Sequence, residues 1–202
     1  MDARITSGWF WGNGKSTPKS MEQLANMYFS SVGRNAPLLL NIPPNNKGTV
    51  DDAILNRVKE FGNAVKETFT NNIAAGKNVS CTASEVRGND IAYSPNNVLD
   101  GNQDTYWTTD DKTEATEATL EVNLGETKQF DVVSIEEAIK FGQRISEFKV
   151  EYKNGSDEWK VFGSGKQWRK ETLQKEPCES GQLRITVKTS EKQNIKRRLS
   201  VK

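Results

Sequence analysis

The sequence predicts a short α/β segment followed by an all-β antiparallel sandwich. Before residue 70, apolar residues recur at helical spacing in two segments, whereas beyond residue 78 short segments alternate between apolar and polar side chains. Between them lies "TNNIAAGKN", residues 70–78, a small and polar stretch that is typical of a linker. We therefore expect one domain at residues 1–73 and a second at residues 74–202.

The first predicted helix lies in "PKSMEQLANMYFSSVG". Ser20 and Gln23 have the spacing of a capping box, and Gly33 is typical of a helix C-terminus. The next segment, "LLLNI" at residues 38–42, is continuously apolar and is followed by Pro43. Such a run is typical of a parallel strand that is buried on both faces.

A second helix is predicted at residues 51–69, "DDAILNRVKEFGNAVKETF", with two aspartates at its positive N-terminal end. Upstream, "RITSGWFW" at residues 4–11 has the pattern of a strand end. The predicted order is therefore strand, helix, strand, helix. Two such units cannot close a barrel, so this segment indicates the end of a larger α/β domain.

The second domain is predicted to consist of short strands. Turn signals such as "LGET" and "KNGSD" separate five alternating segments, which are "ATLEVNL", "FDVVSIEE", "FKVEYKN", "EWKVFG" and "QLRITVKT". Without a credible helix among them, they favour an antiparallel sandwich. The stretch "GSGKQWRKETLQKEPCESG", residues 163–181, is not counted among these segments.

Composition excludes several classes of function. Twenty-eight basic and twenty-seven acidic residues give a net charge of +1, so we expect no nucleic-acid partner, and we interpret the basic carboxyl-terminal region as solvated strand edges. The longest apolar run, "APLLLNI", is too short to cross a bilayer, so we expect no membrane insertion. We also expect no export signal within this chain.

The chain contains no histidine, which excludes the usual general base, the usual zinc ligand and triads that depend on histidine. Its two cysteines, Cys81 and Cys178, lie far apart in the sequence. Two unpaired thiols are favoured over a disulfide.

The segment "TSGWFWGNGKSTPKSMEQLANMYFSSVGRNAPLLLNIPPNNKGTV", continued by the second helix, resembles the closing part of the catalytic barrel of glycoside hydrolase family 29, the α-L-fucosidases. The resemblance covers residues 3–69, and "GWFW" and "SVGRNAPLLLNIPPN" are its most specific motifs. It implies the last two βα units of a (β/α)8 barrel. The carboxyl ends of the strands form the mouth of such a barrel, so Trp9, Trp11 and Asn41 are expected there. The resemblance implies that Trp9 and Trp11 are remnants of the fucose pocket, and indole rings suit the apolar face of a sugar.

This family retains anomeric configuration, which requires two carboxyl groups about 5 Å apart. The resemblance implies that both belong to upstream parts of the barrel, so we expect no catalytic residue here, no cofactor for catalysis and no activity of this chain alone. The acids of the first segment are expected at helix starts or on faces away from the strand mouths; they are Glu22, Asp51, Asp52, Glu60 and Glu67.

"SPNNVLDGNQDTYWTTDD" and the strands after it are similar to the factor five/eight type C domain, also called discoidin domain or carbohydrate-binding module family 32. The fold implied is a galactose-binding-like jelly roll, which family 29 enzymes often carry after the barrel. The resemblance also implies a structural Ca²⁺ bound by the Asp100 carboxylate, the Thr105 hydroxyl and the backbone carbonyls of Asn97 and Asn102. The alternative is a loop of this shape held without metal.

The end of the chain departs from that family's pattern. "NIKRRLSVK" has Arg197 and Arg198 near the place of the family's closing glutamate. Candidate sugar contacts in the module are Tyr93, Arg144 and Trp168, whereas Trp107 is expected in the core. The expected ligands are glycans that contain fucose or galactose.

Taken together, these patterns predict the carboxyl-terminal part of a secreted or surface-bound bacterial α-L-fucosidase, which would remove terminal α-L-fucose from glycans. Two alternatives remain at this point, namely a free-standing carbohydrate-binding or adhesion protein and an inert gene remnant. The sequence leaves open the fucose linkage and the ligand of the module.

Overall fold

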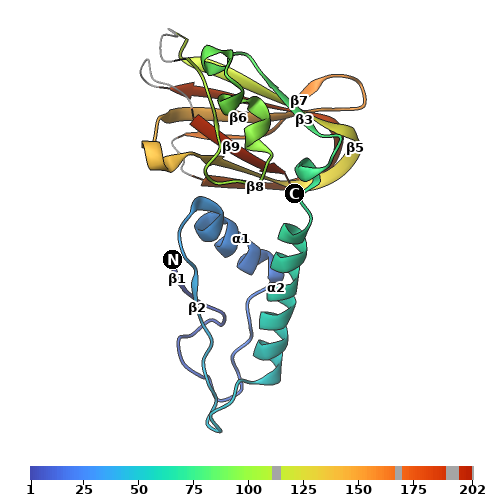
Figure 1. Ribbon diagram of the computed structural model, residues 1–202. Helices are drawn as coiled ribbons and strands as arrows, with labels where there is room; N and C mark the ends of the chain where they lie inside the picture. Colours follow the sequence, from blue (N-terminus) through green and yellow to red (C-terminus); the bar gives the residue numbers. More distant parts are fainter. Residues whose placement is uncertain (111–114, 167–169, 190–195, 202) are drawn as a thin grey trace. The chain divides into compact units, whose positions relative to one another are not determined.

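The computed structural model describes residues 1–110, 115–166, 170–189 and 196–201 (Figure 1). The chain forms two compact units, Met1–Asn71 and Asn72–Lys202, which we call unit 1 and unit 2. Each unit has its own cluster of buried apolar side chains. No helix in the described ranges is both long and apolar enough to span a bilayer.

Unit 1 follows the predicted order of strand, helix, strand and helix. Its elements are β1 (Asp2–Arg4), α1 (Met21–Ser31), the short 3-10 helix η1 (Val32–Arg34), β2 (Leu39–Asn41) and α2 (Asp52–Thr70). The two strands pair in parallel, with Ala3 opposite Leu40. Parallel pairing brings their carboxyl ends to the same edge.

The predicted capping box at the start of α1 is confirmed. The Ser20 hydroxyl accepts a hydrogen bond from the Gln23 backbone N–H at 3.2 Å, and the Gln23 side-chain oxygen accepts one from the Ser20 N–H at 3.1 Å. Both bonds satisfy N–H groups that the first turn of a helix leaves without partners. The sequence therefore fixes where α1 begins.

The core of unit 1 is small. Its fully buried apolar side chains are Ile5, which follows β1, Leu24 of α1 and Ile54 of α2. At its edge the Tyr28 ring of α1 packs at 5.7 Å from the Phe69 ring of α2. Burial raises the pKa of the Tyr28 hydroxyl.

Two expectations for the strands of unit 1 are wrong. The chain is not a strand as far as residue 11, because β1 ends at Arg4 and Thr6 instead forms a bridge with Pro18. Nor is β2 buried on both faces, since Leu39 is 68% exposed. Within unit 1 β2 pairs with β1, and the described residues leave its far face uncovered.

Unit 2 is mainly antiparallel sheet. Its strands are β3 (Ser80–Ala83), β4 (Trp107–Thr108), β5 (Glu117–Glu137), β6 (Ile145–Lys153), β7 (Trp159–Lys166), β8 (Lys170–Thr189) and β9 (Lys196–Val201). Single 3-10 turns connect them, at η2 (Ile73–Ala75), η3 (Arg87–Asn89), η4 (Ile91–Tyr93), η5 (Pro95–Val98) and η6 (Ile139–Phe141).

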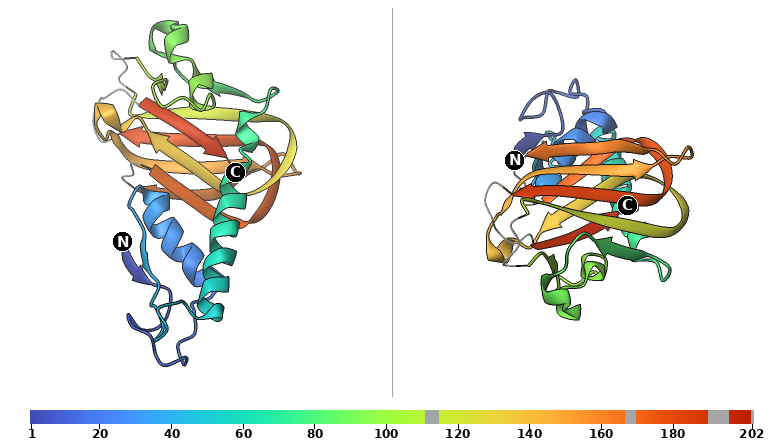
Figure 2. Two further views of the ribbon diagram at one scale, coloured as in Figure 1. Left: turned by 60° about the horizontal axis from the view of Figure 1, so that its bottom comes forward. Right: turned by 90° about the horizontal axis from the view of Figure 1, so that it is seen from above.

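The strands follow the order β4-β9-β5-β8-β6-β7, and β3 also pairs with β5. The two long strands, β5 and β8, bend and contribute to both layers of the sandwich (Figure 2). Residues 117–123 of β5 pair with β3 and with the end of β8, whereas residues 128–136 pair with the start of β8 and with β9. The alternating apolar side chains of these strands meet in one core.

Two sequence expectations for unit 2 need correction. The "LGET" segment is not a turn between strands, because β5 continues through it with a register shift and Gly125 takes a φ of +80°. Much of residues 163–181 is strand, as β8 pairs with β5 from Lys170 onward. Pro177 lies at the second register shift, between the pairs Phe130/Cys178 and Val132/Gln174, where a strand tolerates a missing N–H.

Candidate functional site

The aromatic segment of unit 1 lies at the carboxyl ends of both parallel strands. Residues 9–11 follow β1, and the Asn41 side chain at the end of β2 donates a 2.8 Å hydrogen bond to the Trp9 backbone oxygen. The sequence predicted Trp9 and Asn41 near the carboxyl ends of neighbouring strands, and this bond joins the two residues. The ring of Trp9 is 43% exposed and that of Phe10 is 86% exposed. Large exposed aromatic rings at a strand edge are available to a partner or ligand.

Asp51 holds the second tryptophan of this segment. Its carboxylate accepts hydrogen bonds from the Asn45 side-chain amide at 2.9 Å and from the Trp11 indole N–H at 2.8 Å. These bonds, that of Asn45 first, lower the pKa of Asp51. Asp51 is the N-cap residue of α2, so its expected place at a helix start is confirmed, and its carboxylate also reaches the aromatic segment. The sequence missed this role because a carboxylate at a helix start is already explained by the helix dipole.

The remaining acids of unit 1 have structural positions. Glu22 and Asp52 lie in the first turns of α1 and α2, and Glu60 forms an ion pair with Arg57 at 2.9 Å.

A cation also faces the aromatic segment, since the Arg4 guanidinium lies 5.8 Å from the centre of the Trp9 ring. The electrostatics at this edge therefore combine one fixed carboxylate, one guanidinium and exposed indole.

Three of the four predicted calcium ligands lie together in unit 2. The Asp100 carboxylate accepts hydrogen bonds from the Asn102 N–H at 2.7 Å and from the Thr105 hydroxyl. The same hydroxyl lies 3.2 Å from the Asn102 backbone oxygen. The fourth residue, Asn97, uses its side-chain amide to donate to Ala92 and Tyr106.

The donors of this loop are oxygen atoms from a carboxylate, a hydroxyl and a carbonyl, which suits a hard cation such as Ca²⁺. Calcium takes six or more oxygen ligands, so Asp100, Thr105 and Asn102 would supply only part of its shell. In the described ranges, no three His, Cys, Asp or Glu side chains gather closely enough to hold a metal. The residues fit a site with a single carboxylate and several neutral oxygens.

Tyr93 belongs to a row of aromatic rings near this loop. Its ring centre lies 5.7 Å from that of Tyr106, which lies 4.9 Å from that of Phe141. The Arg87 guanidinium lies 5.3 Å from the Tyr93 ring. At the other end Lys140 lies over Phe141 and forms an ion pair with Asp104 at 3.1 Å.

The other candidate sugar contacts do not join this row. Arg144 precedes β6, and its backbone N–H donates to Glu137 at 2.6 Å. Trp168 lies outside the described residues. Trp107 is fully buried, and its indole N–H donates to the Glu85 backbone oxygen at 2.8 Å, so its expected place in the core is confirmed.

The two cysteines are free thiols without a nucleophilic environment. Burial raises the pKa of Cys81 to about 12 and that of Cys178 to about 11. A thiol protonated at neutral pH is a poor nucleophile and a poor metal ligand. Neither cysteine is therefore a candidate for chemistry.

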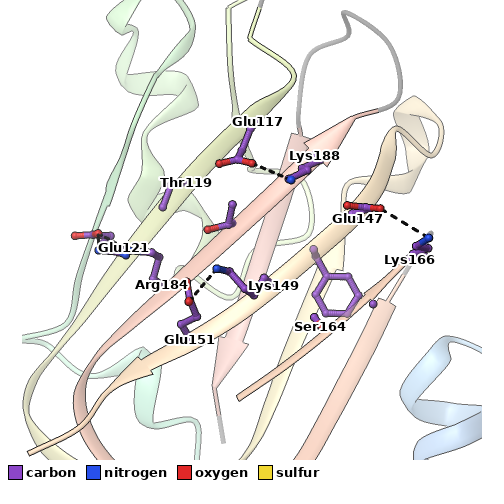
Figure 3. A pocket seen from close by; sticks show the side chains of 13 residues that line it. Glu117, Thr119, Glu121, Glu147, Lys149, Glu151, Ser164, Lys166, Arg184 and Lys188 are labelled. Atoms are coloured by element: carbon purple, nitrogen blue, oxygen red, sulfur yellow. Dashed lines mark hydrogen bonds and ion pairs between the residues drawn. The ribbon is translucent and has the colours of Figure 1, made fainter. Parts of the chain in front are cut away.

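A polar groove of about 860 Å³ runs over the outer face of β5, β8, β6 and β7 (Figure 3). Its rims are ion pairs between side chains that point outward from these strands. At one rim Lys188 pairs with Glu117 at 3.4 Å, and Lys166 with Glu147 at 3.9 Å.

The opposite rim contains Arg184, whose guanidinium contacts the Glu121 carboxylate at 2.8 Å and lies 4.0 Å from the centre of the Trp159 ring. Beside it Lys149 pairs with Glu151 at 2.9 Å (Figure 3). The sequence did not predict this groove, because alternating charged residues are typical of any solvated sheet face.

Comparison with known proteins matches both halves of the chain. The model of the F5/8 type C domain family matches residues 80–201. Alpha-L-fucosidase 1 of Arabidopsis thaliana is 36% identical over 166 residues, which are 81% of this chain and 32% of that protein. The chain thus spans about a third of the length of this relative.

A solved GH29 fucosidase of Ruminococcus gnavus in complex with fucose matches 98% of this chain and 39% of its own, with a TM-score of 0.88 and 49% identity. A family 32 carbohydrate-binding module of Clostridium perfringens in complex with galactose matches 64% of this chain and 96% of its own. Its TM-score of 0.55 at 21% identity indicates a shared fold.

These likenesses confirm the antiparallel fold predicted for the second half of the chain. The two kinds of match differ in extent. The fucosidase match extends over both units, whereas the family model matches residues 80–201, which lie in unit 2. The chain belongs to the F5/8 type C domain family, and its relatives are α-L-fucosidases.

Proposed function

We propose that this chain is the carboxyl-terminal part of an α-L-fucosidase, in which unit 1 supplies the last two βα units of a (β/α)8 barrel and unit 2 is a carbohydrate-binding module. The likeness to fucosidases supports the proposal, as does the parallel pairing of β1 and β2, each followed by a helix. The uncovered face of Leu39 also supports it, because further strands and helices of a barrel would bury that side chain.

The observation that carries this proposal is the hydrogen bond from Asn41 to Trp9. It fixes the aromatic segment at the carboxyl ends of the two strands, and this is the edge at which barrels of this kind form their active sites. In the proposed enzyme Trp9 and Trp11 form one wall of the fucose pocket. An indole face packs well against the apolar face of a pyranose ring.

In this proposal the chain does not hydrolyse glycosides by itself. A retaining glycosidase needs two carboxyl groups about 5 Å apart at the scissile bond. Near the aromatic segment, the carboxylate of Asp51 accepts hydrogen bonds from Trp11 and Asn45, which gives it a structural role. The nucleophile and the acid would come from the remainder of the barrel.

The test is release of 4-nitrophenol from 4-nitrophenyl α-L-fucoside. We expect no release by residues 1–202, and release by the longer enzyme encoded at the same locus. In that longer enzyme Trp9→Ala should raise KM at least tenfold, whereas Leu55→Ala, on α2, should leave KM unchanged. Turnover by residues 1–202 would refute our placement of the catalytic carboxylates.

For unit 2 we propose binding of glycans that contain galactose or fucose. The solved module of similar fold was determined with galactose, and the related fucosidase with fucose. Unit 2 has a core of its own, which also supports the second possibility, a carbohydrate-binding or adhesion function without hydrolysis. Both functions suit an extracellular or cell-surface location on a bacterium.

We further propose that Asp100, Thr105 and Asn102 hold a structural Ca²⁺, which would stabilise the loop of residues 97–105 by drawing its oxygen atoms together. The melting temperature should rise in millimolar CaCl₂ relative to EDTA, and Asp100→Ala should abolish the rise. Asp90→Ala, at the cap of η4, is the control and should retain it. An equal rise in wild type and Asp100→Ala would place the metal elsewhere.

A further inference from the structure

The groove on the outer face of unit 2 has a floor of hydroxyl groups. In the sheet register Thr119 lies opposite Thr186, and on the far side of β6 Ser164 lies opposite Lys149. This row crosses four strands between the two rims of ion pairs. In the described parts of the chain, the three hydroxyls have no hydrogen-bond partner. They are therefore available to a ligand.

Each rim of the groove contains equal numbers of positive and negative side chains. Each carboxylate of the lining, from Glu117, Glu121, Glu147 and Glu151, lies against a lysine or an arginine. The groove therefore has no net charge that would attract an anion or a cation. The groove offers both hydrogen-bond donors and hydrogen-bond acceptors, and the ion pairs between the charged side chains hold these groups in place.

Phe148 lies beneath the same groove. It is only 4% exposed and belongs to the buried core, because β6 turns Glu147 and Lys149 outward and Phe148 inward. A Cβ at residue 165 would lie 2.7 Å from Cε1 of Phe148, so the ring packs closely against β7. The ring thus supports the floor of the groove from the core side.

We propose that this groove binds a neutral oligosaccharide laid across β5, β8, β6 and β7. Such a ligand offers many hydroxyl groups as donors and acceptors and carries no charge, as the lining requires. The volume of about 860 Å³ lies within the range of roughly 300–1,000 Å³ found for small-molecule sites. The inference rests on the proposed carbohydrate binding of unit 2 and adds where on the module the glycan lies.

The test is titration of the 202-residue chain with the uncharged trisaccharide 2′-fucosyllactose, followed by calorimetry and by amide chemical shifts. Ser164→Trp places a bulky ring at the exposed β7 end of the hydroxyl row, and Ser156→Trp makes the same change in the exposed turn between β6 and β7. Thr186→Val removes one half-buried floor hydroxyl at nearly constant shape, and Thr127→Val, at an exposed position, is its control.

We expect Ser164→Trp to weaken binding at least tenfold and Thr186→Val severalfold, with both controls unchanged, and ligand-induced shifts at residues 119, 164 and 186. Retained affinity in Ser164→Trp, or shifts confined to residues 87–106, would overturn the groove while leaving carbohydrate binding intact. Absence of binding by the wild-type chain, with lactose as well, would refute the proposed carbohydrate binding and the groove together. Melting temperatures establish that each variant is folded.

Discussion

Units 1 and 2 differ in how completely they bury their own apolar side chains. In unit 2, buried residues from both halves of β5 and from the second half of β8 meet in one core that includes Trp107. In unit 1 the buried cluster consists of Ile5, Leu24 and Ile54, while Leu39 in the strand pair is largely exposed.

The difference teaches that a regular order of elements is not sufficient for a complete core. Unit 1 has strands and helices in the predicted order, with a well-formed cap, yet too little chain surrounds its two strands to cover them. Buried apolar area provides most of the stability of a domain. We therefore expect unit 2 to be the more stable of the two, and each prediction below tests that contrast.

The largest effect is expected in the core of unit 2. Trp107→Ala should lower the free energy of unfolding of unit 2 by about 3–5 kcal/mol, because it empties a buried site and removes the indole hydrogen bond to Glu85. Urea titration followed by circular dichroism measures the loss. Trp159→Ala removes the same side chain from a half-exposed position over Arg184 and should cost no more than about 1 kcal/mol. Equal losses would contradict the assigned burial.

In unit 1 a core substitution should act on that unit alone. Ile54→Ala, at a fully buried position on α2, should cost about 2–5 kcal/mol, enough to unfold a unit with so small a core. The helical signal at 222 nm should fall, while the urea midpoint of unit 2 stays unchanged. A shift of both transitions by the same amount would mean that the units unfold together.

A smaller effect is expected at the start of α1. Ser20→Ala removes the capping hydroxyl and should destabilise the helix by about 1 kcal/mol. Amide hydrogen exchange of residues 21–31 reports the change directly. Ser30→Ala, whose hydroxyl donates only to the Met27 carbonyl near the helix end, is the matched control. The cap has no role if both variants exchange alike.

The smallest effect is expected when the pH is lowered and the Asp51 carboxylate becomes protonated. The pKa of Asp51 in the folded chain is lowered from the usual 3.8. The ionised carboxylate therefore stabilises the fold above that value, and this stabilisation is lost as the pH falls through the folded pKa. At a pH below 3.8, as the pH falls through the lowered pKa of Asp51, the indole N–H resonance of Trp11 should move because its acceptor is protonated. In Asp51→Asn the resonance should be displaced already at pH 7. A Trp11 resonance that is independent of both changes would refute this contact.

Local chemistry made much of the fold predictable. The capping box of α1 depends on residues three apart, and β6 has strict alternation, so both could be predicted from short windows. The bend of β5 could not, because Gly125 fits a turn signal as well as it fits an irregular strand with φ of +80°. The strand from Lys170 lacked alternation, since it contains Pro177 at a register shift.

The sites show the same division. Trp9 and Asn41 were placed together because parallel strands share an edge, and the hydrogen bond between them agrees with that geometry. The groove depends on the register that sets Glu117 beside Lys188 and Lys188 beside Glu147, which are residues far apart in the sequence. No pattern within one strand contains that information.

The most direct test of the contrast between the units is hydrogen–deuterium exchange of the 202-residue chain, read out by mass spectrometry on peptides from each unit. We predict that peptides from α2 exchange within seconds to minutes, since unit 1 opens easily, whereas peptides from β5 and β8 remain protected for hours. Equal protection of α2 and the two long strands would contradict the claim that unit 1 has the less complete core.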